Sequence, residues 1–317
     1  MRDWIELADE VVVVDSFSQD GTVQLIQSGL RHPNLRFLTH PPGLYQSWNH
    51  GIGQLHTRYV YISTVGDSIT RQGLEHLHAV AERLECDVVV SKPRFIANDG
   101  SSITDDARWP IDDIIHTLQA RQPVRLVGMR LFLFALTNVT GAILGSSASN
   151  LYRARVLQER PFPADYGTVG DGAWGIANVF DYHLGVTPER CSTFRCHPKA
   201  YAASDYAVED LNWKLFELAQ TTFEQRRAAD PALLAEALRC GCDQLIRLVR
   251  SHLQWHRRLE RFRRGRFPWS LNPAAWHARA RRNHFGRRMH EYKLAVLRSL
   301  DHGCLPGPHP STPLAGG

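Results

Sequence analysis

The stretch YVYISTVGD, residues 59–67, decides the fold class of this chain. Apolar residues alternate through its first part, which predicts a strand at residues 58–63, and a short loop then ends in Asp67. The segment VVVVDSFSQDGT, residues 11–22, has the same plan, because four valines predict a buried strand and Asp15 follows it. Ligands of open α/β sheets bind beyond the carboxyl ends of the strands, so both acids are expected at a ligand-binding edge.

The rest of the first half alternates between strand and helix patterns. The expected elements are a helix at residues 22–30, a strand at 35–38, a loop that enters a helix at 41–55, a helix at 70–84 and a strand at 87–91. This alternation predicts βαβ units and a parallel sheet, and therefore an α/β fold.

After residue 92 the pattern loosens. The expected elements are a strand followed by a helix at residues 147–157, a helix at 170–185 closed by Gly185, a strand at 186–197 and helices from about 206 to 300. The apolar run at residues 131–145 contains polar side chains and is shorter than the ~20 residues that a membrane-spanning helix needs. It is expected to form a buried or interfacial helix.

Length and composition narrow the class of protein. The chain has 317 residues, 43% of them hydrophobic, which suits one large or two modest domains with real cores. The N-terminal sequence MRDWIELADE is mixed and acidic, unlike a secretory signal. None of the six cysteines forms a CxxC pair, and a chain of this length needs no disulfide framework. We therefore expect reduced thiols and a cytoplasmic protein.

Positive charge gathers near the C-terminus. The net charge is +5, and between Arg257 and Arg298 the only acids are Glu260 and Glu291, while many arginines interleave with aromatic residues. Such helices suit anionic lipid or nucleic acid, and equally an extension that packs its aromatic rings on the rest of the chain. The final segment, LPGPHPSTPLAGG, is rich in Pro and Gly and is expected to be disordered.

Three acids could bind or activate a ligand. Asp15 could accept hydrogen bonds from a ribose or a base, or only cap the turn after its strand. Ser18 and Asp20 are better placed to cap the following helix, which favours the ligand role. Asp67 could bind Mg²⁺ or Mn²⁺, or only stabilise a turn. Asp171 lies between two glycines at a helix start, where backbone N–H groups stabilise a carboxylate, and it could equally be an N-cap alone.

Two further residues are candidates. His197 has Arg195 and Lys199 as neighbours, so it could be a metal ligand, a phosphate contact or an ordinary surface histidine. Asn49 could contact a nucleotide or cap a turn, whereas core packing explains Trp48 beside it.

In this order, the segments resemble the family-2 glycosyltransferases of the GT-A fold. Members usually show an acid and S-x-D-G-T after a strand, then G-x-x-x-A-x-N-x-G-I, a metal-binding D-x-D region, an acceptor-side segment and an acid at a helix start. The matching segments are VVVVDSFSQDGT, GLYQSWNHGI, ISTVGDSI, GSSASNLYRARVL and GDGAW. The resemblance spans roughly residues 4 to 200. It implies an α/β, nucleotide-sugar-binding Rossmann-like sheet followed by a basic helical region.

The resemblance implies a role for each candidate. Asp15 would hydrogen-bond the donor nucleotide near the uracil or ribose, and Asn49 would lie against it. Asp67 would bind a divalent cation, Mn²⁺ or Mg²⁺, that bridges the donor diphosphate, and His197 aligns loosely with a late histidine of some members. Asp171 would be the general base. The implied reaction is inverting transfer of a sugar from a UDP-sugar or similar donor to the hydroxyl of a glycan or lipid-linked acceptor.

The chain departs from the family pattern at two points. Val65 stands where the first acid of the D-x-D pair is expected, and the family's first strand and helix have no counterpart. We expect a GT-A-like catalytic domain that is short at its N-terminus at residues 1–205, a basic helical extension at 206–300 and a disordered tail at 301–317. The basic helices would give peripheral contact with the inner face of the membrane.

Other functions remain as alternatives. Val65 and the short N-terminus also suit a degenerate GT-A domain that binds without catalysing. A dinucleotide-dependent oxidoreductase is disfavoured because no G-x-G-x-x-G precedes the acids. Nucleic-acid binding through the basic region is not expected, because it would leave the acids at the sheet edge without a role.

Overall fold

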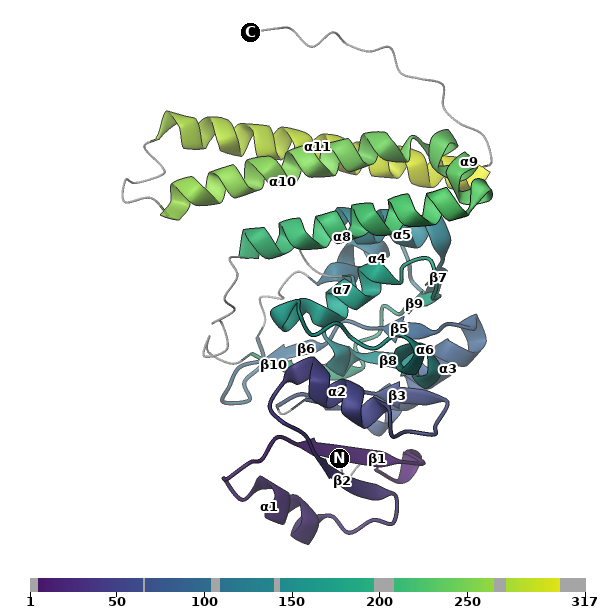
Figure 1. Cartoon of the computed structure of the whole chain (residues 1–317), viewed down its shortest axis with the longest axis vertical. Coiled ribbons are helices and arrows are strands. Elements are labelled where there is room, and N and C mark those ends of the chain that lie inside the picture. The colour runs from purple at the N-terminus through teal and green to yellow at the C-terminus, as the bar shows by residue number, and fades with distance from the viewer. Residues whose placement is uncertain are drawn as a thin grey trace, which may run out of the picture. The chain divides into compact units, whose positions relative to one another are not determined.

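The computed structural model divides the chain into two compact units, Met1–Thr222 and Phe223–Gly317 (Figure 1). The structure describes residues 5–64, 66–103, 109–139, 143–196, 208–264 and 272–302. The division falls inside α8 (Val208–Ala229), whereas the sequence predicts a domain boundary after residue 205, which stays a prediction. From residue 303 onward, the tail lies outside the described residues.

The first unit is a mixed α/β structure. Before α8 its elements are η1 (Ile5–Leu7), β1 (Val11–Asp15), α1 (Thr22–Gly29), β2 (Leu35–Thr39), α2 (Leu44–Ile52), β3 (Tyr59–Tyr61), β4 (Ser68–Ile69), α3 (Arg71–Leu84), β5 (Val88–Val90), β6 (Arg94–Ile96), α4 (Pro110–Leu118), β7 (Val124–Leu126), α5 (Gly128–Thr137), η2 (Ser147–Ser149), β8 (Asn150–Arg153), α6 (Ala154–Glu159), η3 (Gly167–Val169), α7 (Gly170–Ala177), β9 (Leu184–Val186) and β10 (Ser192–Arg195).

β1 and β2 form a parallel two-stranded sheet, as the valine run predicts. Val11 pairs with Leu35 and Asp15 pairs with Thr39, so Asp15 lies at the carboxyl end of its strand. α2 packs directly on β1, because a Cβ at Gly51 would lie 2.9 Å from Cγ2 of Val14. The last turn of this helix therefore packs on the strand that carries Asp15.

The main sheet has the order β3-β8-β5-β9-β7 and is mixed. Only β5 and β9 pair in parallel, while the other neighbours are antiparallel. The prediction of a parallel sheet is therefore wrong here. The cause is β8, which enters between the predicted strands at β3 and β5: Tyr152 pairs with Val60 on one side and Val88 on the other.

A third sheet carries the segment after Asp67. Its order is β4-β10-β6, with β10 antiparallel to β4 and parallel to β6. The strand predicted near the end of the 186–197 segment is thus present, and it lies directly against the residues that follow Asp67.

The helix predicted at residues 170–185 is shorter than expected. α7 ends at Ala177, and Gly185 lies inside β9 rather than after a helix. A Cβ at Gly185 would come 3.1 Å from Sγ of Cys86 and 3.2 Å from Cγ2 of Val89. The glycine therefore permits close strand packing and does not terminate a helix.

The apolar run after residue 130 forms a buried helix, as predicted. In α5 the side chains from Leu131 to Leu136 are all buried. Of the described helices, none has both the length and the apolar character that crossing a bilayer requires. The five described cysteines are free thiols.

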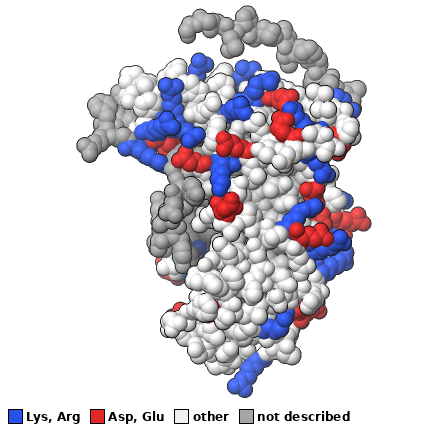
Figure 2. Space-filling model, viewed as in Figure 1, with Lys and Arg blue, Asp and Glu red and all other residues white. Residues whose placement is uncertain are grey.

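The second unit is helical, as the sequence predicts. After the end of α8 it contains α9 (Pro231–Cys240), α10 (Cys242–Arg264) and α11 (Pro273–His302). α10 and α11 run side by side (Figure 1), and Trp255 and Phe262 pack between them against Leu259, Ala275 and Ala278. The arginines of these helices remain largely on the surface, and Figure 2 shows basic side chains there interspersed with acidic ones.

Candidate active site

Asp15 shapes the loop that follows β1. One carboxylate oxygen, Oδ2, accepts a hydrogen bond from the backbone N–H of Ser18 at 3.0 Å. The N-cap of α1 is Gly21, and neither Ser18 nor Asp20 caps the helix as predicted, although Oδ1 of Asp20 accepts the N–H of Thr22 at 3.0 Å. Asp15 therefore stabilises the turn after β1, and its carboxylate lies at the edge of the sheet.

Phe17 in the same loop has an unusual backbone. Its φ is 63°, in the left-handed region that a side chain disfavours, and its ring is 55% exposed. Strained residues of this kind are concentrated at functional sites. Sequence reasoning missed Phe17, because φ is not visible in the residue type.

Asp67 is held by two donors from different segments. The hydroxyl of Thr64 donates to Oδ2, and the backbone N–H of Arg195 in β10 donates to Oδ1 at 3.1 Å. Burial raises the pKa of the nearby Tyr61 phenol, and the negative charge of Asp67 raises it further. Asp67 thus has a fixed orientation.

Asp171, at the start of α7, is 7% exposed and accepts three hydrogen bonds. Oδ1 accepts from the Tyr45 hydroxyl at 3.0 Å and from the Gly172 N–H at 2.9 Å, and Oδ2 accepts from the Ser147 hydroxyl at 3.5 Å. Burial raises the pKa of Asp171 to about 6, while these donors oppose the rise because they stabilise the anion.

A chain of buried polar groups leads to Asp171 from η2 and β8. The Asn150 side-chain amide donates to the Tyr152 hydroxyl at 3.0 Å, and the Tyr152 hydroxyl lies 3.0 Å from Oγ of Ser147. Since Ser147 donates to Asp171, its oxygen accepts the Tyr152 proton. All donors therefore point towards the carboxylate. At the start of this chain of groups, Oδ1 of Asn150 is buried without a hydrogen-bond partner among the residues that the structure describes.

Asn49 fastens α2 to the segment that precedes Asp171. Its amide nitrogen donates to the carbonyl of Phe162 at 2.8 Å, and its amide oxygen accepts the N–H of Phe162 at 2.9 Å. The packing of Trp48 is confirmed, since its ring contacts those of Tyr45 and Phe162. The polar character of Asn49 therefore has a structural use, and its contact with a nucleotide stays a prediction.

α2 links the Asp15 loop to Asp171. Its Ser47 hydroxyl lies 3.4 Å from that of Ser16, the residue after Asp15, and its Tyr45 binds Asp171. η2 gives a second link, because the Ser192 hydroxyl in β10, the strand that holds Asp67, donates to Oγ of Ser149 at 2.8 Å. The three predicted acids thus belong to one connected region of the first unit.

His197 and Val65 lie outside the described residues. Within the described part of the chain, no three His, Cys, Asp or Glu side chains gather as a metal site. Asp67 supplies carboxylate oxygens, the ligand type that Mg²⁺ and Mn²⁺ prefer, so it fits as one protein ligand of a cation whose other ligands come from phosphates and water.

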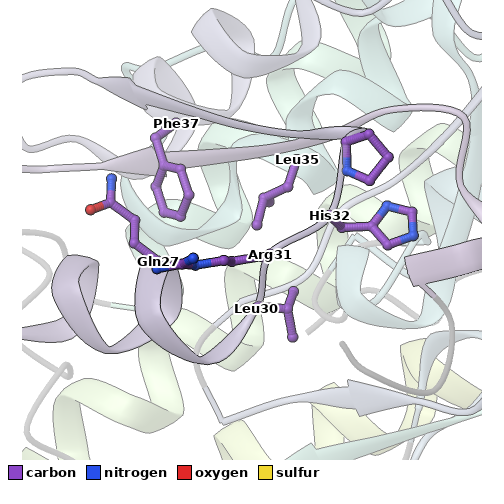
Figure 3. Close-up of a pocket in the computed structure, with 7 residues that line it drawn as sticks. Gln27, Leu30, Arg31, His32, Leu35 and Phe37 are labelled. Carbon is purple, nitrogen blue, oxygen red and sulfur yellow. The ribbon is translucent and has the colours of Figure 1, made fainter.

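A surface cavity lies elsewhere in the first unit. It has a volume of about 450 Å³ and is widely open. Figure 3 shows Phe37 and Leu35 opposite Gln27 and Arg31, with His32 beyond Leu35. Leu35 begins β2, whereas Asp15 pairs with the residue that ends it, so this cavity lies towards the opposite end of the two-stranded sheet from Asp15. We do not assign the predicted chemistry to it.

Solved structures of a bacterial protein show limited similarity. The crystal structure of S. aureus TarS residues 1–349 in complex with UDP is 14% identical, covers 93% of this chain and 82% of that chain, and gives a TM-score of 0.45. The crystal structure of the same fragment in complex with UDP-GlcNAc is also 14% identical. It covers 93% of this chain and 83% of that chain, and its TM-score is 0.48. Similarity of this degree leaves the function to be argued from the chain's own residues.

The family assignment comes from the sequence. No curated protein matches the chain. Residues 2–140 match the family model described as glycosyl transferase family 2. This segment contains Asp15, Asn49 and Asp67, while Asp171 lies beyond it. The predicted resemblance to this family, its GT-A fold class and the enzyme class of glycosyltransferase are thereby confirmed. Residues 2–140 are therefore similar to glycosyl transferase family 2.

Proposed function

We propose that the chain transfers a sugar from a nucleotide-diphosphate donor, a UDP-sugar, to an acceptor hydroxyl with inversion, and that Asp171 is the general base. The environment of Asp171 carries the proposal. A carboxylate with its pKa raised to about 6 is still ionised near neutral pH, and it holds a proton more readily than an ordinary aspartate does.

In the proposed reaction Asp171 takes the proton of the acceptor hydroxyl while that oxygen attacks the anomeric carbon of the donor. The bond from that carbon to the diphosphate breaks, and the diphosphate leaves with the electron pair. The hydroxyl must come within roughly 2.6–3.2 Å of a carboxylate oxygen, and such a base contributes about 10²–10⁴-fold. Tyr45 and Gly172 share Oδ1, whereas Oδ2 has only the longer bond from Ser147. We assign Oδ2 as the oxygen that takes the proton.

Asp15 is proposed to bind the donor nucleotide. It ends a buried strand at the carboxyl edge of the sheet, where nucleotides bind in α/β folds. Asn49 is proposed to border the nucleotide from α2, in addition to its bonds with Phe162.

Asp67 is proposed to hold Mn²⁺ or Mg²⁺ at the donor diphosphate, with His197 as a further ligand. A cation there would stabilise the negative charge of the leaving diphosphate. The carboxylate is oriented for this by Thr64 and by the backbone of Arg195.

The acceptor is proposed to be a glycan or a lipid-linked glycan. We place the protein in the cytoplasm, with α10 and α11 resting on the inner face of the membrane. Surface arginines of these helices would contact anionic lipid, each contributing about 1 kcal/mol near the surface. Nucleic acid is not a proposed partner.

Thermal unfolding with UDP, GDP, CDP or ADP, each with and without Mn²⁺, tests the donor site. A ligand at 100 times its Kd stabilises a fold by about 2.7 kcal/mol, which is a readable shift. We expect a shift with UDP that grows with Mn²⁺ and loses its metal dependence in Asp67→Asn. Glu75→Gln, on the exposed face of α3, is the matched control. No shift with any nucleotide would favour a non-catalytic GT-A module.

A further inference from the structure

The Tyr45 hydroxyl is the only phenol bonded to Asp171 among the described residues. Tyr45 is 2% exposed, and its hydroxyl lies 3.0 Å from Oδ1 of Asp171 and 3.0 Å from the carbonyl oxygen of Thr168. The hydroxyl has one proton and two acceptors. Which acceptor receives that proton therefore depends on the charge of Asp171.

The Tyr45 ring is fixed from several sides. A Cβ on Gly170 would lie 2.5 Å from Cε2 of this ring, so the ring rests directly on the backbone before Asp171. The rings of Trp48 and Phe162 lie 5.1 Å and 5.8 Å from it between centroids. Asn49 clamps the Phe162 backbone to the same helix. The hydroxyl is thus held in place before any substrate binds.

The charge of Asp171 decides the strength of the bond. When Asp171 is ionised, Tyr45 gives it a charge-assisted hydrogen bond, which is about twice as strong as a neutral one. When Asp171 has taken a proton, the phenol can turn to the Thr168 carbonyl at no loss of bonding. The phenol itself stays protonated, because burial and the Asp171 charge both raise the pKa of Tyr45.

The other side-chain donor to Asp171 is weaker. Ser147 lies 3.5 Å from Oδ2, at the limit of a hydrogen bond, and its position depends on the Tyr152 hydroxyl. The third donor is the backbone N–H of Gly172, so no side-chain substitution removes this hydrogen bond. Tyr45 is therefore the side chain on which the ionised state of Asp171 depends most.

We propose that Tyr45 is a positioning residue that keeps Asp171 ionised and oriented, and so sets the pH range over which the transferase works. This inference rests on the proposed role of Asp171 as the base. It assigns to the Y in GLYQSWNHGI a function separate from nucleotide binding.

Tyr45→Phe tests the proposal, because it removes the hydroxyl and keeps the ring. The pH dependence of kcat with the donor found by the thermal assay should show its acidic limb displaced upward by about one unit, since burial of Asp171 is then less compensated. Near pH 6 the variant should be about fivefold slower than the wild type, and near pH 9 the two should converge. The donor-induced thermal shift should be unchanged.

Tyr182→Phe is the matched control. Tyr182 is also buried, and its hydroxyl donates to the carbonyl of Gly175 at 3.1 Å in the same helix that carries Asp171. The Tyr182→Phe substitution removes a buried phenol that does not touch the carboxylate of Asp171. The acidic limb of its kcat profile should coincide with that of the wild type. Equal displacement in both variants, or none in Tyr45→Phe, would overturn the proposal.

A second measurement separates this inference from the proposed function. The pH dependence of unfolding, compared between chains with Asp171 and with the Asp171→Asn change, reports the pKa of Asp171 without any turnover. The pKa of Asp171 obtained in this way should be higher in the Tyr45→Phe variant than in the wild type. An unchanged pKa contradicts the role of Tyr45. A raised pKa in an enzyme whose turnover survives Asp171→Asn contradicts the base assignment instead, and with it the link from Tyr45 to catalysis.

Discussion

Gly170 lies directly beneath the ring of Tyr45. A Cβ at Gly170 would come 2.5 Å from Cε2 of that ring and 2.5 Å from the carbonyl oxygen of Pro163. The backbone of Gly170 is helical, with φ −62°, so an L-residue is not excluded there by conformation. The glycine is required by its neighbours and not by its own dihedral angles.

Gly170→Ala should therefore destabilise the fold. Alanine is favoured over glycine in helices by about 1 kcal/mol, but forcing a methyl group into this contact costs roughly 1–3 kcal/mol. We expect a net loss of stability together with a raised pKa of Asp171, because the Tyr45 hydroxyl is pushed from its acceptor. Urea unfolding and its pH dependence measure the two effects, and a variant as stable as the wild type would show that the ring does not press on this position.

Phe17→Gly should be more stable than Phe17→Ala by about 1 kcal/mol. The positive φ of Phe17 disfavours any residue with a Cβ, and the 55% exposed ring contributes little burial. The alanine variant keeps the Cβ and loses the ring, so the comparison isolates the backbone strain. Denaturant unfolding of the two variants decides the point, and equal stabilities would mean that the loop is unstrained.

The contribution of Asp171 to the free energy of unfolding should fall as the pH rises from about 4 to about 6. Burial raises the folded-state pKa of Asp171 from 3.8 to about 6, so in this window the native chain binds a proton that the unfolded chain has released. Asp171→Asn lacks this titration. Its stability relative to the wild type should increase by roughly 3 kcal/mol across the window and then level off. A relative stability that is constant from pH 4 to pH 8 would contradict the raised pKa.

Asn49→Ala should cost about 2–3 kcal/mol, since it leaves the N–H and the carbonyl of Phe162 without their partners. Gln46→Ala on the exposed face of the same helix is the control and should change stability little. Urea unfolding compares them. Equal effects of the two substitutions would deny that Asn49 clamps α2 to the Phe162 segment.

Vesicles that contain anionic lipid should bind the protein in a salt-dependent way. Arg287 and Arg288 are exposed on α11, and reversing both charges should weaken flotation markedly. The same reversal at Arg71 and Arg155 in the first unit, which are also exposed, is the control. Flotation that is independent of salt, or equally weakened by both pairs, would remove the membrane from the proposed partners.

The local elements were predictable because their signals are local. The valine run gives β1, and the periodic leucines give α3, with Thr70 capping its first turn through the N–H of Gly73. The antiparallel entry of β8 between β3 and β5 was not predictable, because it depends on pairing across a long insertion. The contacts around Asp171 were not predictable either, because they also join segments far apart in the sequence. Tyr45 lies 126 residues from Asp171, and the position of Tyr45 in α2 indicates only that it belongs to a buried helix face.

Turnover by Asp171→Asn, measured together with donor binding, decides whether Asp171 is the base. Release of the nucleoside diphosphate should fall by about 10²-fold or more, while the donor-induced thermal shift should stay close to that of the wild type. Full turnover in the variant would show that Asp171 is not the base. Lost donor binding would show that Asp171 serves the nucleotide or the fold instead.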